Sequence, residues 1–124
     1  MKVLIVDKST EVRERLFDVL SELEGVDGVA QAGDSLEALA QMRTAAPDAV
    51  VLDIDTDGLE WMDMLRQVKD SSSSPRLIIF TNSTHPHVRD KCMDLGADYF
   101  FDKSVELDRV LDVVESLTWR GLQR

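Results

Sequence analysis

Five short apolar runs recur along the chain, and each is followed by turn residues and then by a segment of helical pattern. Four of the runs contain no polar residue, which is typical of strands covered on both faces in a parallel sheet. The second run is weaker because Gly28 interrupts it. We therefore expect strands at residues 3–6, 26–32, 49–52, 77–80 and 99–101.

The segments between these runs carry apolar residues three and four positions apart, the spacing of an amphipathic helix. The first helix is expected after the turn residues 7–10 and should stop at Gly25. Asp34 and Glu37 resemble a capping box that opens the second helix, and Pro47 should end that unit.

The third helix is expected near Trp61, and the fourth should follow the segment 85–87 and run to Leu95, where Gly96 stops it. A last helix occupies the C-terminal part of the chain. Apolar residues at helical spacing are expected to face the core in four of the helices. They are Val12, Leu16, Val19, Leu20 and Leu23 in the first helix, and Leu36, Leu39 and Ala40 in the second. In the third they are Trp61, Met62, Leu65 and Val68, and in the last Leu107, Val110, Leu111, Val114 and Leu117.

Strands that alternate with helices predict a parallel sheet with helices on both faces and right-handed crossovers. The chain has 124 residues, enough for one sheet-and-helix core, so we expect a single α/β domain over residues 1–124. The strand order 2-1-3-4-5 places strand one beside strand three and brings the reactive loops together. The predicted fold class is therefore a three-layer, doubly wound α/β domain of five strands and five helices.

The net charge and the cysteine content limit the classes of function that fit the sequence. The formal net charge of −10 argues against nonspecific binding to nucleic acid or to an anionic membrane, since both need a basic surface. A single cysteine, Cys92, excludes an internal disulfide and is expected to be a small buried helix residue. No signal peptide or membrane-length apolar run is present in the sequence, so we expect a cytoplasmic protein.

Four reactive side chains are expected at one edge of this sheet. Asp7, Asp53, Thr81 and Lys103 follow strands one, three, four and five, and the carboxyl ends of parallel strands form the ligand crevice. An aspartate can attack phosphorus to give an acyl phosphate if nearby cations and donors offset the repulsion between the two anions. The alternative is that Asp53 only caps the next turn.

The same residues carry a resemblance to response-regulator receiver domains over nearly the whole chain. It rests on Leu4-Ile5-Val6-Asp7, Val51-Leu52-Asp53, Ile79-Phe80-Thr81 and the segment 96–103, which ends in Asp102-Lys103. The resemblance implies a flavodoxin-like fold and a phosphorelay role in which a histidine kinase or histidine phosphotransfer protein phosphorylates Asp53. It also implies that Lys103 contacts the phosphoryl oxygens and that Thr81 is the switch hydroxyl.

Further expectations follow from this resemblance. Phe100 stands at the family's aromatic switch position, although it is also explained as a plain core phenylalanine. The readout surface would be the fourth helix, fifth strand and fifth helix, which would contact a downstream protein target. The chain would be no enzyme beyond promoting its own phosphorylation and dephosphorylation, and it would be a monomer or weak homodimer. It would be a stand-alone receiver or a fragment of a longer protein.

Lys8 departs from the family pattern, which has a second acid at this position. The resemblance implies a Mg²⁺ site at Asp7, Asp53 and Asp55, and an ammonium in place of the second acid would weaken it. Two readings of Lys8 stay open: it neutralises the acids as an internal cation, or its head lies in solvent. The first favours an alternative function, a phosphate-independent receiver-like interaction module held in an active-like shape by Lys8.

Other classes fit the sequence less well. Residues 53–58 resemble the start of an EF-hand loop, but Met64 stands where a bidentate glutamate is required. A haloacid-dehalogenase-type phosphatase would share the strand ending at Asp53, but a whole strand-helix unit precedes it and too little chain follows. His85 and His87 are expected in solvent, and no phosphate-binding glycine loop supports nucleotide binding.

Overall fold

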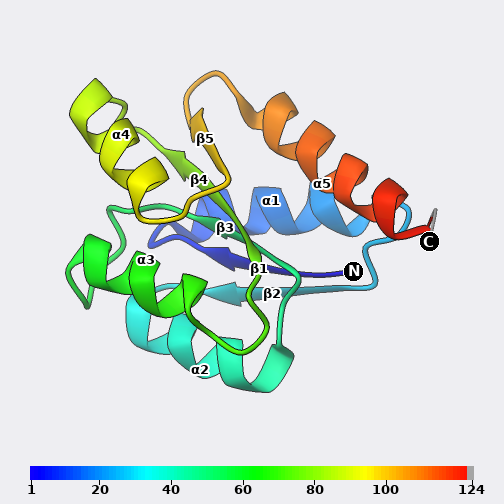
Figure 1. Cartoon of the computed structure of the whole chain (residues 1–124). Coiled ribbons are helices and arrows are strands. Elements are labelled where there is room, and N and C mark those ends of the chain that lie inside the picture. The colour runs from blue at the N-terminus through cyan, green and yellow to red at the C-terminus, as the bar shows by residue number, and fades with distance from the viewer. Residues whose placement is uncertain (123–124) are drawn as a thin grey trace.

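The computed structural model describes the backbone of residues 1–122 and the side chains of residues 1–118. Within these residues, five strands alternate with five helices (Figure 1). The elements are β1 (Lys2–Val6), α1 (Thr10–Ser21), β2 (Gly28–Ala32), α2 (Ser35–Ala45), β3 (Ala49–Leu52), α3 (Trp61–Lys69), β4 (Arg76–Thr81), α4 (Pro86–Asp94), β5 (Tyr99–Asp102) and α5 (Leu107–Leu122). The predicted alternation is confirmed.

The strands form one parallel sheet in the order β2-β1-β3-β4-β5, which confirms the predicted topology. Val6 pairs with Leu52, and Thr81 pairs with Asp102. The carboxyl ends of β1 and β3 therefore lie side by side, as do those of β4 and β5. Residues that follow these four strands meet at one edge of the sheet.

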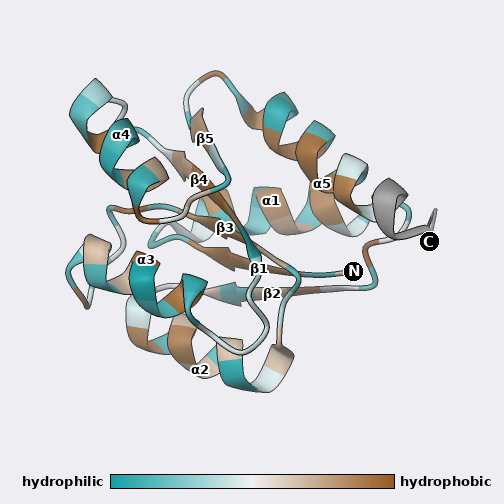
Figure 2. Cartoon of the chain, in the orientation of Figure 1, coloured by the Kyte–Doolittle hydropathy of each residue, from teal (hydrophilic) through white to brown (hydrophobic). Residues whose placement is uncertain are grey.

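Successive strand residues point to opposite faces of the sheet and fill two separate cores. In β1, Leu4 packs into the core under α2, α3 and α4, whereas Ile5 packs into the core under α1 and α5 (Figure 1). Both side chains are fully buried. Figure 2 shows β1, β3 and β4 as the largely apolar centre of the molecule and the helices as mixed apolar and polar. The three-layer, doubly wound architecture is thus confirmed.

The predicted inner face of α2 is wrong. Leu36 is 70% exposed, Ala40 is also exposed, and the fully or nearly fully buried positions are Ser35, Ala38 and Met42. These three residues also follow helical spacing. Ser35 was missed because a buried serine, bonded to a neighbouring loop, looks like a surface residue in a hydrophobic pattern.

The connection from α1 to β2 also differs from expectation. The helix ends at Ser21 rather than at Gly25, and the strand begins at Gly28 rather than at residue 26. Between them the chain makes two tight turns, in which Leu23 N donates to Leu20 O and Val26 N donates to Leu23 O. Gly25 lies inside the second of these turns, with a φ of +91°, and therefore does not end the helix.

The start of α2 and the lone cysteine agree with the sequence analysis, whereas α4 begins at Pro86, inside the segment that was expected to precede it. The side chain of Asp34 caps α2 by accepting a hydrogen bond of 2.8 Å from Glu37 N, while Glu37 Oε2 accepts from Gly33 N rather than from the cap residue. Cys92 is fully buried in α4. Among the helices that the structure describes, none has the length and hydropathy needed to cross a membrane.

Candidate functional site

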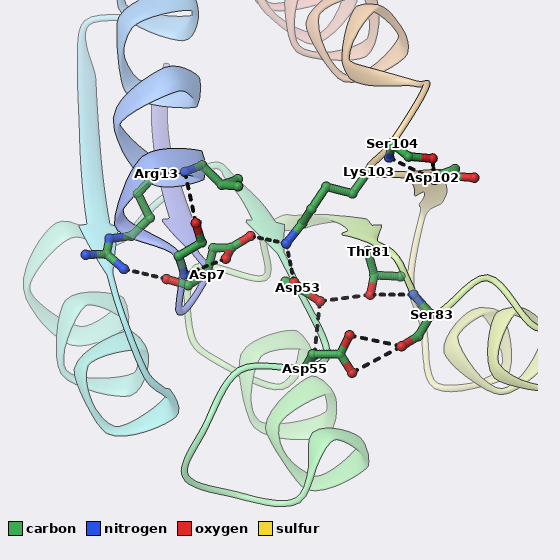
Figure 3. Close-up of polar contacts among 11 residues, drawn as sticks. Asp7, Arg13, Asp53, Asp55, Thr81, Ser83, Asp102, Lys103 and Ser104 are labelled. Atoms are coloured by element: carbon green, nitrogen blue, oxygen red, sulfur yellow. Dashed lines mark hydrogen bonds and ion pairs between the residues drawn. The ribbon is translucent and has the colours of Figure 1, made fainter.

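Asp53 lies directly after β3 with only 4% of its surface exposed. Its backbone N–H donates to Val6 O at 2.9 Å, which extends the pairing of β3 with β1 and fixes the start of the loop. One carboxylate oxygen, Oδ1, accepts from Thr81 Oγ1 at 2.8 Å and from Asp55 N at 3.0 Å (Figure 3). The other, Oδ2, contacts Lys103 Nζ. Both oxygens of this buried carboxylate are therefore held by donors.

Asp7 lies beside it at the end of β1 and is 2% exposed. Its Oδ1 accepts from Ser9 N at 2.8 Å, and its Oδ2 lies 2.6 Å from Lys103 Nζ. One ammonium therefore bridges two buried carboxylates, Asp7 and Asp53 (Figure 3). Burial by itself would lower the pKa of Lys103, but the hydrogen bonds and charges of these two carboxylates outweigh it and raise that pKa.

The turn between β5 and α5 positions Lys103. Its backbone N–H donates to Thr81 O at 2.9 Å, as the next rung of the β4–β5 pairing. The preceding residue, Asp102, accepts from Ser104 N at 2.8 Å and from Ser104 Oγ at 2.6 Å, and its own N–H donates to Glu106 Oε1. The bonds from Ser104 hold the pKa of Asp102 below its usual value. The lysine thus projects from a turn that local side chains fix.

A second pair of polar residues lies next to Asp53, and the sequence analysis missed half of it. Ser83 Oγ donates to the exposed carboxylate of Asp55, at 3.1 Å to Oδ1 and 3.0 Å to Oδ2. Ser83 N also donates to Thr81 Oγ1 at 3.2 Å. This pair links the loop after β3 to the loop after β4. The only sequence signal for Ser83 is its place two residues after Thr81.

Arg13 is a further contact of the site that sequence reasoning did not find. Its Nη1 donates to Asp7 O at 2.7 Å (Figure 3). Its Nη2 donates to Thr10 Oγ1 at 3.2 Å. It therefore braces the β1–α1 loop from the first helical turn. An arginine at that place in a helix has no sequence feature that separates it from a surface residue.

The structure thus brings together Asp7, Asp53, Thr81 and Lys103, as the strand order predicts. Phe100 does not join them, because its half-buried ring packs against the core under α2, α3 and α4. Its role as a switch stays a prediction, as do the phosphoacceptor role of Asp53 and the phosphoryl contacts of Thr81 and Lys103. The expected placement of His85 and His87 is found, since both are exposed, with His85 Nδ1 accepting from His87 N at the start of α4.

Lys8 is exposed, and no ion pair joins it to Asp53 or Asp55 within the described residues. This arrangement agrees with a lysine head in solvent. The cation that neutralises the buried acids is Lys103. The reading of Lys8 as an internal counter-ion is therefore not the arrangement found.

Mg²⁺ takes hard oxygen ligands and keeps several waters. The carboxylates at the site are the side chains that could supply such ligands. Asp7 Oδ2 and Asp53 Oδ2 converge on one cationic atom, Lys103 Nζ, so these two carboxylates lie close enough to share one cation. The Asp55 side chain is turned to Ser83 instead, and the described residues contain no group of three or more His, Cys, Asp or Glu side chains placed to hold a metal. The side chains thus fit a two-carboxylate site.

Comparisons with known proteins agree with this geometry. The family model described as the response regulator receiver domain matches residues 3–115. A curated relative from Syntrophomonas wolfei, named protein-glutamate methylesterase/protein-glutamine glutaminase 1, is 34% identical over 121 residues, covering 94% of this chain and 34% of the relative. The chain therefore spans about a third of the length of that relative, and 24% of the length of a similarly named protein from Myxococcus xanthus.

Solved structures show the same fold. The N-terminal domain of an uncharacterized protein from Wolinella succinogenes superimposes with a TM-score of 0.86 at 28% identity, covering 99% of this chain and 98% of that one. The response regulator domain of Thermotoga maritima CheB gives a TM-score of 0.78 at 22% identity, with coverage of 100% and 97%. Together with the matched family model, these findings show that the chain belongs to the response regulator receiver domain family.

Proposed function

We propose that this receiver domain accepts a phosphoryl group on Asp53 from a histidine kinase or histidine phosphotransfer protein and signals by contact with a downstream protein. The observation that carries the proposal is the buried carboxylate of Asp53, which is held between the Thr81 hydroxyl and the Lys103 ammonium. A carboxylate that only capped a turn would need neither contact. Thr81 ends β4 and Lys103 follows β5, so both contacts come from residues distant from Asp53 in the sequence.

The proposed reaction is an in-line phosphoryl transfer. An oxygen of the Asp53 carboxylate forms a bond to phosphorus while the P–N bond of the phosphohistidine breaks, and the electron pair of that bond leaves with the imidazole. Water later attacks the acyl phosphate, which releases inorganic phosphate and restores the carboxylate. The chain would act on no other substrate, so we propose a signalling domain rather than an enzyme.

Charge stabilisation would come from residues already at the site. Lys103 contacts an oxygen of Asp53 and can contact the phosphoryl oxygens once the phosphoryl group is transferred. The Thr81 hydroxyl can donate a hydrogen bond to the same oxygens. A Mg²⁺ ion held by Asp7 and Asp53 would, when bound, neutralise further charge on the phosphoryl group. Lys8 adds no ligand to that ion.

The proposed signal is a change in the loops around Asp53. Phosphorylation adds about −1.5 to −2 charges, and Thr81 would exchange its bond to Asp53 Oδ1 for one to the phosphate. Thr81 Oγ1 also accepts a hydrogen bond from Ser83 N, so a movement of Thr81 would change a contact of the β4–α4 loop. We propose that α4, β5 and α5 present the result to a protein target, with no role in nucleic-acid or membrane binding.

The second candidate is a phosphate-independent interaction module on the same fold. Its supporting observation is that Lys103 already neutralises Asp7 and Asp53, while Lys8 replaces an acid that the family uses for the metal. This module would bind its target without modification of Asp53. It makes the same structural predictions, so only chemistry separates the two candidates.

The test is incubation with acetyl phosphate or a phosphorylated histidine protein, with and without Mg²⁺, followed by intact mass measurement. We expect one phosphoryl adduct that hydroxylamine removes and that Asp53→Asn abolishes. Asp57→Asn, an exposed acid in the same loop, is the matched control and should retain the adduct. No adduct at high donor and Mg²⁺ concentrations would reject the phosphoacceptor role and favour the second candidate.

A further inference from the structure

Ser35, the first residue of α2, is fully buried and bonds to the loop that follows β3. Its backbone N–H donates to Asp57 O at 2.9 Å, and its Oγ accepts from Leu59 N at 2.6 Å. Two successive parts of that loop are therefore tied to a single residue of another element. A buried serine that bonds only within its own helix would do neither.

Gly58 lies between these two contacts and fits the loop closely to the serine. Its φ of +113° lies in the region that favours glycine. A Cβ at this position would overlap Ser35 Oγ and lie 3.1 Å from Ser35 Cβ. The loop can therefore approach the Ser35 hydroxyl only because residue 58 has no side chain.

The other end of the same loop holds the carboxylate of Asp53. Asp55 N donates to Asp53 Oδ1 at 3.0 Å, and Thr56 N donates to Asp53 O at 3.3 Å. The loop is thus fixed at its first residues by Asp53 and at its last residues by Ser35. Only a short piece of chain separates the two fixed points, so we expect movement at the Ser35 end to displace the Asp55 amide.

We propose that Ser35 is a positioning residue, which seats residues 55–59 so that the Asp55 N–H keeps the Asp53 carboxylate oriented for phosphoryl transfer. The effect on transfer rests on the proposed phosphoacceptor function, whereas the effect on the Asp55 amide does not. Ser35 contacts neither the reacting oxygen of Asp53 nor the place where the phosphodonor would bind. It acts through the loop alone.

The size of the effect follows from the lost hydrogen bond. In Ser35→Ala the half-buried Leu59 N–H loses its acceptor, and a hydrogen bond of this kind is worth about 1 kcal/mol, or about fivefold in the ratio of seated to unseated loop. We therefore expect the phosphorylation rate of Asp53 to fall by up to about fivefold. Alanine fits the space of serine, so the variant should fold.

The experiment compares the wild type, Ser35→Ala and a matched control, Ser71→Ala. Ser71 Oγ donates to Val68 O at 2.7 Å in the loop before β4, at the opposite edge of the sheet, so its loss is a similar but remote change. Two quantities are measured on protein that is fully folded by circular dichroism. They are the initial rate of phosphorylation by acetyl phosphate and the hydrogen exchange rate of the Asp55 amide by NMR.

The proposal expects faster exchange at Asp55 and slower phosphorylation in Ser35→Ala, with both unchanged in Ser71→Ala. Unchanged exchange at Asp55 overturns it, as does faster exchange with an unchanged phosphorylation rate, because Ser35 would then be merely structural. If the wild type takes no phosphate at all, the proposed function fails by itself. Faster exchange at Asp55 in Ser35→Ala would still support the positioning of the carboxylate.

Discussion

The Lys103 ammonium lies 2.6 Å from the Asp7 carboxylate and contacts Asp53 at the same time. Both carboxylates are nearly fully buried, so removal of the shared cation leaves two adjacent buried anions. Breaking a buried ion pair from one side typically costs several kcal/mol. We expect Lys103→Met to lower the free energy of unfolding at pH 7 by about 3 kcal/mol, measured by urea denaturation.

The control for this prediction is a double-mutant cycle. Adding Asp53→Asn to Lys103→Met removes one of the two anions, so the double variant should recover a large part of the lost stability. Asp53→Asn alone keeps the pair between Lys103 and Asp7 and should cost much less than Lys103→Met. Additive effects of the two substitutions would contradict the idea of a shared cation.

We expect Lys8 to weaken the binding of a divalent cation at the site. It is exposed, follows Asp7 in the sequence, and supplies a positive charge where the resemblance implies an acid. Lys8→Asp adds an oxygen ligand and removes that charge, so we expect Mg²⁺ to bind at least roughly tenfold more tightly by isothermal titration calorimetry. Lys91→Asp, an exposed position on α4, makes the same change in net charge and should leave the affinity nearly unchanged.

An equal gain in both variants would show that Lys8 acts only through the overall charge of the protein. No gain in either would show that an aspartate at residue 8 does not reach the ion. The comparison therefore separates a local ligand from a general electrostatic effect. In the second case, the departure at residue 8 would not explain any weakness of the metal site.

The strand order explains why most of the site could be predicted. Asp7, Asp53 and Thr81 are the residues at or just after strand ends, and a parallel sheet in a known order brings these ends together. No loop conformation has to be known for this step. The same reasoning found Lys103, because it follows β5.

The contacts between loops could not be predicted in this way. Ser83 reaches Asp55, and Ser35 reaches Leu59, only because of backbone turns that hydrophobic spacing does not specify. The error on α2 has the same origin. Leu36 was predicted to face the core because it is apolar, but the helix is rotated so that Ser35 is buried instead. The neighbouring loop satisfies the hydrogen bonds of this polar residue.

Cys92 is fully buried in α4, and burial raises the pKa of its thiol to about 11. Because the thiolate is the reactive form, at pH 8 the fraction of reactive thiolate is roughly a hundredfold below that of a cysteine with an ordinary pKa. We expect no measurable reaction with Ellman's reagent in the native protein and full reaction in urea. Rapid reaction of the folded protein would show that α4 opens readily.

Asp98 holds the start of β4 and should control the stability of the protein in acid. Its Oδ2 accepts from Lys69 Nζ and from Leu77 N, both at 2.8 Å, and Arg76 Nη1 lies 3.6 Å from its Oδ1. Burial alone would raise the pKa of Asp98, but these bonds and charges outweigh it and lower the pKa.

The folded state therefore binds the Asp98 proton more weakly than the unfolded chain, and stability rises with pH between the two pKa values. This contribution is complete above the unfolded pKa of about 3.9 and is lost as the pH falls through the lower folded value. Asp98→Asn should lower stability at pH 7 and flatten its dependence on pH below about 4, measured as urea midpoints. Asp90→Asn, an exposed acid on α4, should leave the curve unchanged. If the urea midpoint of Asp98→Asn fell just as steeply in acid, other carboxylates would be responsible for the loss of stability.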